Sequence, residues 1–351
     1  MTCDNTRQML DAVRQACPGF ATDGRYIRTE TSLLLPGRVA GVPVLAKHPV
    51  DPRPFWQDRC RHEIAVYQAL AREGTVPLPV PALVTADAGY PLLVMTRLPG
   101  RPLHPCRYPP ARPSAGTLTS MLAALRLLHN WRPSPAFPDD SDYTAQFTRI
   151  ACDLIPPADL RCITRLCDTA MPALQIEHGD AHLANALATP AGVALVDLEC
   201  TAWRPAGYDL AKLWVFLAAS PSSRAAIASA VSTQPRRLAG FWVAVTLVTA
   251  REITSCLRHP GLPAAAGRLR QLNADLRAAL SSIRRLHDEV TWQKTIMHPP
   301  AIVPAPALTL PIAPGRVPRR GHGRPRRHHA GHDDRASLEC TARIYHSGGL
   351  Q

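Results

Sequence analysis

The sequence predicts an α+β fold with two lobes, in which strands and a helix precede a mainly helical part. Three observations support this prediction. Short β-prone runs and one central helix follow a short leading helix within the first hundred residues. Leu98-Pro99-Gly100 then interrupts the pattern and is typical of a hinge. Beyond it, apolar residues recur at helical spacing up to about residue 286, around one short hairpin.

The part before the hinge alternates between helix and strand signals. Residues 5–17 form a predicted helix that Pro18-Gly19 ends. A second helix is predicted for 57–72, and Glu73-Gly74 ends it. Residues 25–47 are predicted to form strands, and the β-prone runs of this part are 33–35, 42–46, 80–85 and 92–96.

Helices dominate the part after the hinge. Leucines at helical spacing predict a helix over 117–129, and a further helix is predicted for 158–171. A small hairpin is predicted for 185–198, and helices from Tyr208 onward. We therefore expect a first lobe at 1–98, a second at 99–292 and a Pro/Arg-rich tail at 293–351. The tail has no periodic apolar face, which predicts disorder.

Composition limits the compartment and the partners. The 10 cysteines include no CxxC pair, which indicates reduced thiols and predicts a cytoplasmic protein. The longest apolar runs are about half of the ~20 residues that span a bilayer, so we expect no membrane segment. The net charge is +13, and residues 300–351 supply eight arginines against three acids. Nucleic-acid binding is therefore considered only for the arginine-rich stretch 316–327.

Three polar residues in the second part have the spacing that phosphoryl transfer from ATP requires. Asn185 follows Asp180 by five residues, and Asp197 follows Asn185 by twelve. One carboxylate must hold the acceptor hydroxyl, and an amide with a second carboxylate must hold Mg²⁺ against the triphosphate. We predict that Asp180 is catalytic and that Asn185 and Asp197 bind the metal. The alternative is three ordinary loop residues that cap or close turns.

The neighbours of these residues have less certain roles. We expect His178 to hydrogen-bond the backbone of the metal-binding loop, and His182 to do the same or to line the site. Glu199 would face the side of Asp197 if the strand continued. It could then bind a second Mg²⁺, contact the substrate or be solvated.

The stretch His178-Gly179-Asp180-Ala181-His182-Leu183-Ala184-Asn185, followed by an apolar strand and Asp197-Leu198-Glu199, resembles the aminoglycoside phosphotransferase and choline kinase group of protein-kinase-like enzymes. The resemblance extends over about residues 20–290. It implies a protein-kinase-like fold with an antiparallel N-lobe sheet plus a helix and a mainly helical C-lobe. It also implies ATP or GTP as donor, Mg²⁺ as cofactor and a small-molecule hydroxyl as acceptor.

The resemblance also implies the nucleotide site. Lys47, at the end of an apolar strand, corresponds to the lysine that contacts the phosphates, and Glu63 to the glutamate that pairs with it. Such pairing is physically reasonable because an unpaired buried ammonium is costly. The backbone at Thr96 and Leu98 is expected to bind the adenine edge. No Gly-x-Gly-x-x-Gly precedes Lys47, so Asp23-Gly24 or residues 28–32 must cover the phosphates.

The charge of the second part argues against a polycationic aminoglycoside as acceptor. Residues 210–274 contain a single acid, Glu252, against eight basic residues, which are Lys212, Arg224, Arg236, Arg237, Arg251, Arg258, Arg268 and Arg270. A neutral, weakly charged or anionic acceptor is expected. Four acids elsewhere keep a cationic acceptor open, namely Asp139, Asp140, Asp142 and Glu177.

A second interpretation is a catalytically inactive, kinase-like nucleotide-binding protein. The missing glycine-rich loop favours it. The joint presence of Lys47, Asp180, Asn185 and Asp197 favours an enzyme instead.

Overall fold

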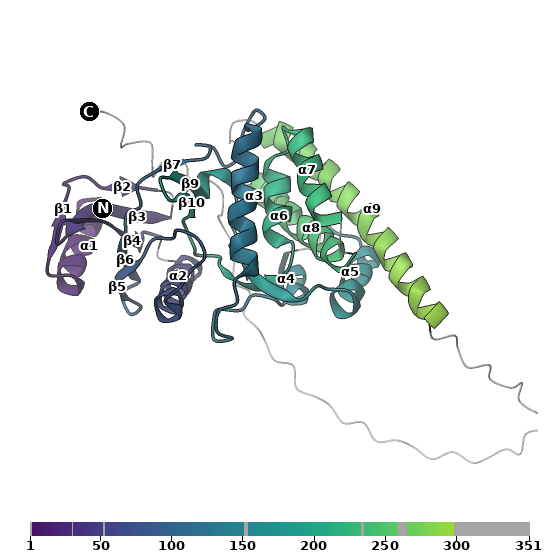
Figure 1. The fold of residues 1–351 in the computed structure, drawn as a ribbon, viewed down its shortest axis with the longest axis horizontal. Coiled ribbons are helices and arrows are strands. Elements are labelled where there is room, and N and C mark those ends of the chain that lie inside the picture. Colours follow the sequence, from purple (N-terminus) through teal and green to yellow (C-terminus); the bar gives the residue numbers. More distant parts are fainter. Residues whose placement is uncertain are drawn as a thin grey trace, which may run out of the picture.

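The computed structural model describes residues 2–29, 31–51, 53–150, 154–232, 235–258 and 265–297. They form two lobes, one built on a sheet and one built of helices (Figure 1). This is the predicted protein-kinase-like α+β arrangement. The first five residues of the tail predicted at 293–351 are not disordered, since they belong to the last helix, which ends at Met297. The rest of the predicted tail, 298–351, with the nucleic-acid stretch 316–327, lies outside the described residues.

The N-lobe is an antiparallel sheet with two helices. Its strand order is β1-β3-β4-β6-β5, and β2 pairs with β3. The helices are α1 (Thr2–Ala16) and α2 (Pro54–Glu73). The strands are β1 (Phe20–Thr22), β2 (Ile27–Arg28), β3 (Ser32–Val39), β4 (Val42–Pro49), β5 (Leu83–Asp87) and β6 (Leu92–Thr96).

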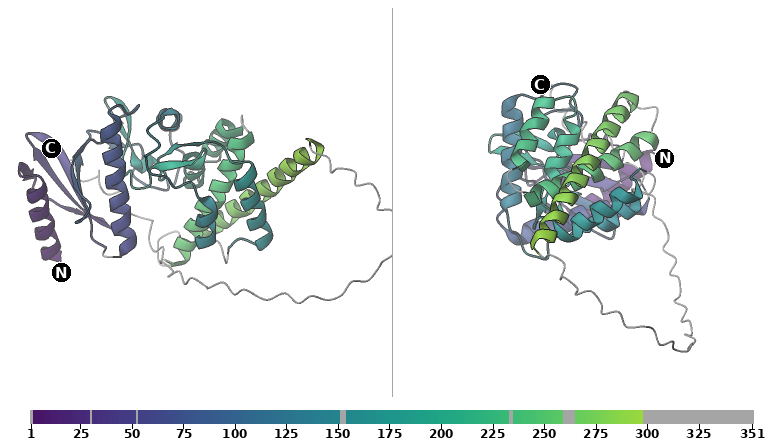
Figure 2. Two further views of the ribbon diagram at one scale, coloured as in Figure 1. Left: turned by 90° about the horizontal axis from the view of Figure 1, so that it is seen from below. Right: turned by 90° about the vertical axis from the view of Figure 1, so that its right-hand side faces the viewer.

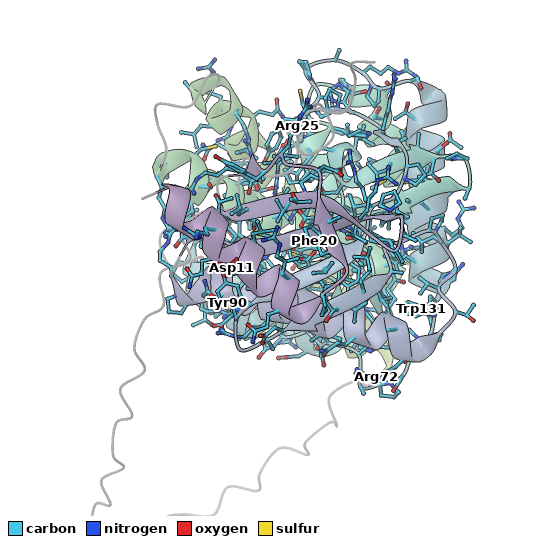
Figure 3. All side chains as sticks on the ribbon, turned by 90° about the vertical axis from the view of Figure 1, so that its left-hand side faces the viewer. Asp11, Phe20, Arg25, Arg72, Tyr90 and Trp131 are labelled. Carbon is cyan, nitrogen blue, oxygen red and sulfur yellow. The ribbon has the colours of Figure 1, made fainter. Side chains whose placement is uncertain are left out.

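Both faces of this sheet are buried, which explains its continuous apolar runs. Side chains alternate between faces along a strand. Leu33 and Leu35 lie in the cluster that contains Met9 of α1, whereas Leu34 lies in the cluster with Ile64 of α2. Figure 3 looks onto the first face, with Asp11 of α1 at the front and Phe20 beside the helix. The second face, under α2, is the one that looks toward the site.

The C-lobe packs its helices around α6 and α8. Fully buried side chains of four helices meet in one core, for example Leu125, Phe216, Phe241 and Ile283. Helix α9 runs along the outside of this lobe (Figure 1 and Figure 2). The helices are α3 (Ala115–Asn130), α4 (Tyr143–Ile150), α5 (Pro157–Thr169), α6 (Tyr208–Phe216), α7 (Pro221–Ser232), α8 (Pro235–Arg258) and α9 (Ala265–Met297).

Two small sheets connect the lobes to the site. In one, β10 (Gly192–Leu195) pairs with β9 (Ala186–Thr189), which pairs with β7 (Arg101–Pro102). In the other, β8 (Leu174–Glu177) pairs with β11 (Ala202–Pro205). The predicted hinge therefore leads from β6 into β7. At Gly100 the backbone φ is +147°, and a Cβ would lie 2.6 Å from the carbonyl oxygen of Ala188.

The sequence prediction missed mainly short elements. It did not predict β7 and α4, nor the two strands β8 and β11, which pair with each other. The last helix continues to Met297, beyond the predicted end near Leu286. Within the described chain, no helix has the length and apolarity needed to cross a bilayer.

We predict that Gly37→Ala destabilises the N-lobe. Gly37 lies in β3 opposite Thr22, and a Cβ there would lie 2.6 Å from the carbonyl oxygen of Ala21 and 2.5 Å from the ring of Phe20. Such overpacking costs about 1–3 kcal/mol, measurable as a lower free energy of unfolding in urea. Gly116→Ala in α3 is the matched control, because its nearest atom would be 3.9 Å away. Equal stability of the two variants would contradict the packing argument.

Candidate active site

The three residues predicted to act on Mg-ATP lie on one continuous turn-and-hairpin unit. Strand β8 leads directly into Asp180, and a single 3-10 turn (Leu183–Asn185) delivers Asn185. The N–H of Val196 donates to the carbonyl of Asn185 at 3.0 Å, so Asp197 follows immediately beside it. Asp197 has a φ of +64°, which turns the chain away from the strand direction.

Asp180 is a buried carboxylate with two cationic neighbours and one histidine beside it. Its oxygens lie 2.5 Å from Nζ of Lys212, 3.1 Å from Nη2 of Arg107 and 3.3 Å from Nε2 of His182. Burial raises the pKa of Asp180, but Arg107, Lys212 and His182 outweigh it and hold this pKa well below its usual range. Asp180 is therefore ionised and can accept a hydrogen bond from a hydroxyl.

Asn185 is oriented by Asp180 and has a spare acceptor. Its Nδ2 donates to the carbonyl oxygen and to Oδ2 of Asp180, each at 3.1 Å. Its Oδ1 is buried and has no hydrogen-bond partner among the described residues. A buried oxygen without a donor is costly unless a ligand satisfies it. Together with the carboxylate of Asp197 it offers the oxygen ligands that Mg²⁺ prefers, so these residues fit the expected metal.

Lys47 is the centre of a cluster of three carboxylates. Its Nζ lies 2.8 Å from Glu63, 2.8 Å from Asp197 and 3.2 Å from Glu199. Burial lowers the pKa of Lys47, but Asp197, Glu63 and Glu199 outweigh it and raise this pKa well above its usual value. The predicted pairing of Lys47 with Glu63 is present. Strand β10 ends at Leu195, so Glu199 reaches the site through a turn and not along a continued strand as the sequence suggested.

A small cavity of about 30 Å³ lies beside Lys47 and fits the predicted nucleotide side. Thr96 lines it, but its N–H already donates to the carbonyl of Ala82 at 2.8 Å and is therefore engaged within the protein. Leu98 does not line this cavity; it packs against Leu187, Ala194 and Val196. The lining residues are Leu34, Leu45, Lys47, Glu63, Pro81, Met95, Thr96, Arg97, Val196 and Asp197.

A buried cluster beneath the loop holds its backbone in place. Asp209, the second residue of α6, accepts from the N–H groups of His178 at 2.7 Å and Gly179 at 2.8 Å. His129 of α3 lies 3.1 Å from Asp209 and 3.0 Å from Glu177. Burial lowers the pKa of His129, but the two carboxylates outweigh it and raise the pKa to about 9. His129 is thus a cation that joins two buried carboxylates.

Glu177 belongs to this cluster, a role that the sequence did not reveal. Its Oε1 accepts from the N–H of Gly207 and its Oε2 from the N–H of Asp209, both at 2.8 Å. Since β8, α3 and α6 come from distant parts of the chain, no local spacing marks this contact. The side chains of His129, Glu177 and Asp209 lie close enough together to hold a metal ion. However, the carboxylate oxygens already accept hydrogen bonds from groups of the protein.

His178 has the role predicted for it. Its Nε2 lies 2.9 Å from the carbonyl of Val196, and its Nδ1 accepts from the N–H of Asp180 at 3.2 Å. The ring therefore carries its proton on Nε2 and connects the catalytic loop to the residue before Asp197. Gly179 is required between them, because its φ is +77° and a Cβ would lie 2.1 Å from the carbonyl oxygen of Cys200.

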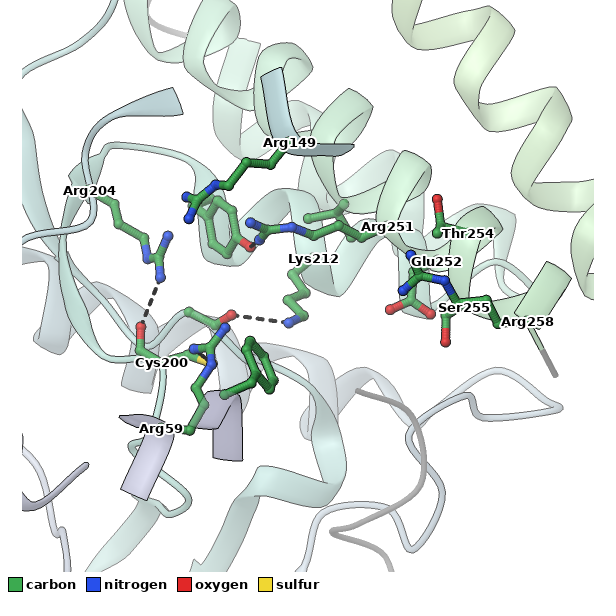
Figure 4. Close-up of a pocket in the computed structure, with 14 residues that line it drawn as sticks. Arg59, Arg149, Cys200, Arg204, Lys212, Arg251, Glu252, Thr254, Ser255 and Arg258 are labelled. Carbon is green, nitrogen blue, oxygen red and sulfur yellow. Dashed lines mark hydrogen bonds between the residues drawn. The ribbon is translucent and has the colours of Figure 1, made fainter. Parts of the chain in front are cut away.

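A second cavity, of about 150 Å³, is lined by Gly179, the residue before Asp180, and by Lys212, which contacts Asp180. Of the eight basic residues noted in the sequence, Lys212, Arg251 and Arg258 line it (Figure 4). Arg224 instead pairs with Asp275 at 2.6 Å, and Arg268 pairs with Glu252. The full lining is Phe55, Arg59, Arg149, Gly179, Cys200, Arg204, Tyr208, Lys212, Val248, Arg251, Glu252, Thr254, Ser255 and Arg258.

Comparison with known proteins gives one family match. The model of the phosphotransferase enzyme family matches residues 44–241, more than half of the chain. A search of curated protein sequences found no match.

Three solved structures share the fold over nearly their whole length. Macrolide 2'-phosphotransferase MphH from Brachybacterium faecium is 18% identical, with 76% of this chain and 98% of that chain covered and a TM-score of 0.50. A choline/ethanolamine kinase family protein from Mesorhizobium loti is 19% identical, with 79% and 99% covered and a TM-score of 0.50. A thermostable mutant of aminoglycoside phosphotransferase APH(4)-Ia, in complex with AMP-PNP and hygromycin B, is 13% identical, with 78% and 97% covered and a TM-score of 0.53.

We predict that the His129 cluster sets the alkaline limit of stability. The pKa of His129 is raised from 6.5 to about 9 in the folded state, so its contribution is complete below pH 6.5 and is lost as the pH rises through 9. The wild-type free energy of unfolding should fall over this window by on the order of 3 kcal/mol. In His129→Leu, stability at pH 6 should be lower by about 3–5 kcal/mol, and this fall should be absent.

Urea unfolding between pH 6 and pH 10 measures both effects. His104→Gln is the control, because within the described chain the hydrogen bonds of the His104 ring go only to the backbone of Cys106. A His129→Leu variant with the wild-type alkaline slope would show that the slope arises elsewhere.

Proposed function

The chain belongs to the phosphotransferase enzyme family, and we propose that it moves the γ-phosphate of ATP or GTP to a hydroxyl of a small molecule. The main support is the ionised carboxylate of Asp180, which shares one loop unit with the spare oxygen of Asn185 and with Asp197. Nucleotide binding is assigned to residues 1–98 and most of the acceptor site to 99–292.

Asp180 is the proposed catalytic residue. It orients the acceptor hydroxyl by accepting its hydrogen bond, and it takes the proton as the new bond forms. A carboxylate whose pKa lies far below its usual range is a weak base early in the reaction. This suits a loose transition state, in which the acceptor oxygen needs positioning more than prior deprotonation. Arg107 and Lys212 keep the carboxylate ionised and fix its direction.

The nucleotide side follows from the contacts of Lys47. Asn185 and Asp197 are the proposed Mg²⁺ ligands, and the bound ion would neutralise charge on the triphosphate. Lys47, held by Glu63, contributes a fixed positive charge to the phosphates. The carbonyl of Thr96 is the proposed adenine contact, together with the backbone at Leu98. Of the two predicted covers for the phosphates, we favour residues 28–32 over Asp23-Gly24, because β3, which follows them, pairs with Lys47 through Leu34.

The acceptor is proposed not to be a polycationic aminoglycoside. The acids that kept this option open have other partners. Glu177 is fully buried in the His129 cluster, and Asp140 pairs with Arg204. Asp142 accepts from the N–H of Ala145 in the first turn of α4, and Asp139 accepts from the N–H of Ser141. A polycation would therefore meet few uncommitted carboxylates here.

Asp180→Asn should reduce turnover by about 10²–10⁴-fold, because the amide cannot take the hydroxyl proton. The affinity for nucleotide should be nearly unchanged, since Lys47 and Asp197 remain. A coupled assay of ATP consumption, run with a panel of hydroxylated compounds, gives the turnover. Asp58→Asn, on the exposed side of α2, is the matched control. Wild-type turnover in Asp180→Asn would reject the assigned role.

Asp197→Asn should abolish the Mg²⁺ dependence of nucleotide binding. In the wild type, Mg²⁺ should increase the thermal stabilisation that AMP-PNP gives, because bound ligand stabilises the folded state. The Asp180→Asn variant should retain this increase, so it serves as the comparison. Mg²⁺-dependent binding by a wild type that consumes no ATP with any acceptor would instead favour the inactive, nucleotide-binding alternative.

A further inference from the structure

The second cavity, called here the arginine cavity, is connected to Asp180 through two of its lining residues, Gly179 and Lys212. Gly179 and Lys212 form part of its wall, and Nζ of Lys212 lies 2.5 Å from Asp180 and 3.1 Å from the carbonyl of Gly179. None of its lining residues also lines the small cavity beside Lys47. Asp180 itself does not line the cavity, so a compound there would contact Gly179 and Lys212, next to Asp180, without occupying the nucleotide side.

The lining of this cavity has a large excess of positive charge. Its basic residues are Arg59, Arg149, Arg204, Lys212, Arg251 and Arg258, and its single acid is Glu252. Glu252 does not neutralise them, because it is committed elsewhere. Its carboxylate accepts from Tyr108 and pairs with Arg268, and it also lies 3.8 Å from Arg107. The interior of the cavity therefore favours anions.

Two of these arginines have no carboxylate partner within the described chain. Arg251, on α8, donates to the hydroxyl of Tyr208 and to the amide oxygen of Gln146, both at 3.0 Å and both neutral. Arg149, on α4, is exposed and forms no ion pair with any described residue. Arg204 differs, because it pairs with Asp140.

Arg59, at the opposite wall, is satisfied mainly by neutral groups. It donates to the sulfur of Cys200 at 2.9 Å and to the backbone carbonyl of Glu199 at 3.4 Å, and its guanidinium lies over the ring of Phe55. Figure 4 shows the guanidinium ends of Arg59, Arg149, Arg204 and Arg251 turned toward the same space, with Lys212 between them. The cluster is thus convergent and not a scattered surface charge.

We propose that the acceptor is an anion: a small hydroxyl compound whose carboxylate or phosphate group is bound by Arg149 and Arg251 while its hydroxyl faces Asp180. Guanidinium groups bind both kinds of anion through paired, charge-assisted hydrogen bonds. The excess charge of the cavity excludes cationic acceptors by the same forces. The inference rests on the proposed phosphotransferase function and names its substrate class.

The proposed phosphate transfer forms one bond and breaks one bond. The hydroxyl oxygen of the acceptor forms a bond to the γ-phosphorus, and the bond from that phosphorus to the β,γ-bridging oxygen breaks. The nucleoside diphosphate leaves with the electron pair of the broken bond. The hydroxyl proton passes to Asp180 and then to solvent. The anionic group of the acceptor stays on Arg149 and Arg251 and takes no part in bond making.

The inference is tested by ligand binding to the full chain saturated with Mg²⁺ and AMP-PNP, so that turnover is not needed. The probes are D-glycerate, sn-glycerol 3-phosphate, glycerol and choline, which carry a carboxylate, a phosphate, no charge and a positive charge. Titration calorimetry should detect one or both anions and should detect neither glycerol nor choline. Comparison of the two anions decides between a carboxylate and a phosphate ligand.

Arg149→Gln and Arg251→Gln should each weaken binding of the preferred anion by about tenfold or more, the usual effect of losing a charged hydrogen bond. Arg149 is exposed, so its variant should fold normally even if Arg251→Gln does not. Arg126→Gln, on the exposed face of α3, is the matched control and should bind like the wild type.

Three outcomes would overturn the inference. The first is equal anion binding by the Arg149→Gln, Arg251→Gln and Arg126→Gln variants. The second is a loss of AMP-PNP affinity in the two cavity variants, which would show that these arginines contact the triphosphate. The third is tighter binding of glycerol or choline than of either anion. Failure of the proposed function has a different signature, namely arginine-dependent anion binding without ATP consumption for any acceptor.

Discussion

The buried His129–Glu177–Asp209 cluster is the constraint on which the site depends. A single cation from α3 lies between two carboxylates, one at the end of β8 and one in the first turn of α6. The same carboxylates accept the N–H groups of His178, Gly179 and the start of α6. The loop that carries Asp180 therefore has its backbone donors satisfied from below, which leaves the Asp180 side chain to project into the site. Removal of either charge type would leave the other buried and unpaired.

Above this cluster, the charged side chains of the site form two groups, and in each group acidic and basic side chains pair with each other. Lys47 holds Glu63, Asp197 and Glu199 together, while Arg107 and Lys212 hold Asp180. Such pairing keeps buried charges from destabilising the fold, and it places each group where a charged ligand can exchange with it. The side chain of Asn185, with its spare oxygen, contacts the Asp180 group. The arrangement separates the proposed donor side, rich in carboxylates, from the proposed acceptor side, rich in cations.

The sequence predicted best what depends on local spacing. The Asp180, Asn185 and Asp197 set lies within eighteen residues and is joined by one turn and one hairpin, so the spacing largely determines the contact. The strands β3, β4 and β6 also followed from short apolar runs, whereas the pairing of Lys47 with Glu63 followed from the family resemblance. Glu177, Arg107 and Arg59 could not be found in this way, because their partners are on segments distant in sequence. Arg59 had one usable signal, since it precedes Glu63 by one helical turn and so shares its face.

Thr96 and Leu98 lie beside the site, yet the hydrogen bond from Thr96 to Ala82 depends on β5, whose register the sequence did not specify.

The charge of the second lobe shows why composition alone cannot define an acceptor site. Arg224 and Arg251 have the same side chain and lie in the same basic region, but Arg224 is neutralised by Asp275 of α9 whereas Arg251 meets only neutral oxygens. Only an arginine such as Arg251, whose positive charge is not neutralised by a carboxylate, can pair with an anionic ligand. One cation that lines the arginine cavity, Lys212, also lowers the pKa of Asp180. An anion bound beside Lys212 would offset part of its field and so raise the proton affinity of Asp180 when the acceptor is present. In this arrangement the acceptor that the cavity selects is also the one that makes Asp180 a better base.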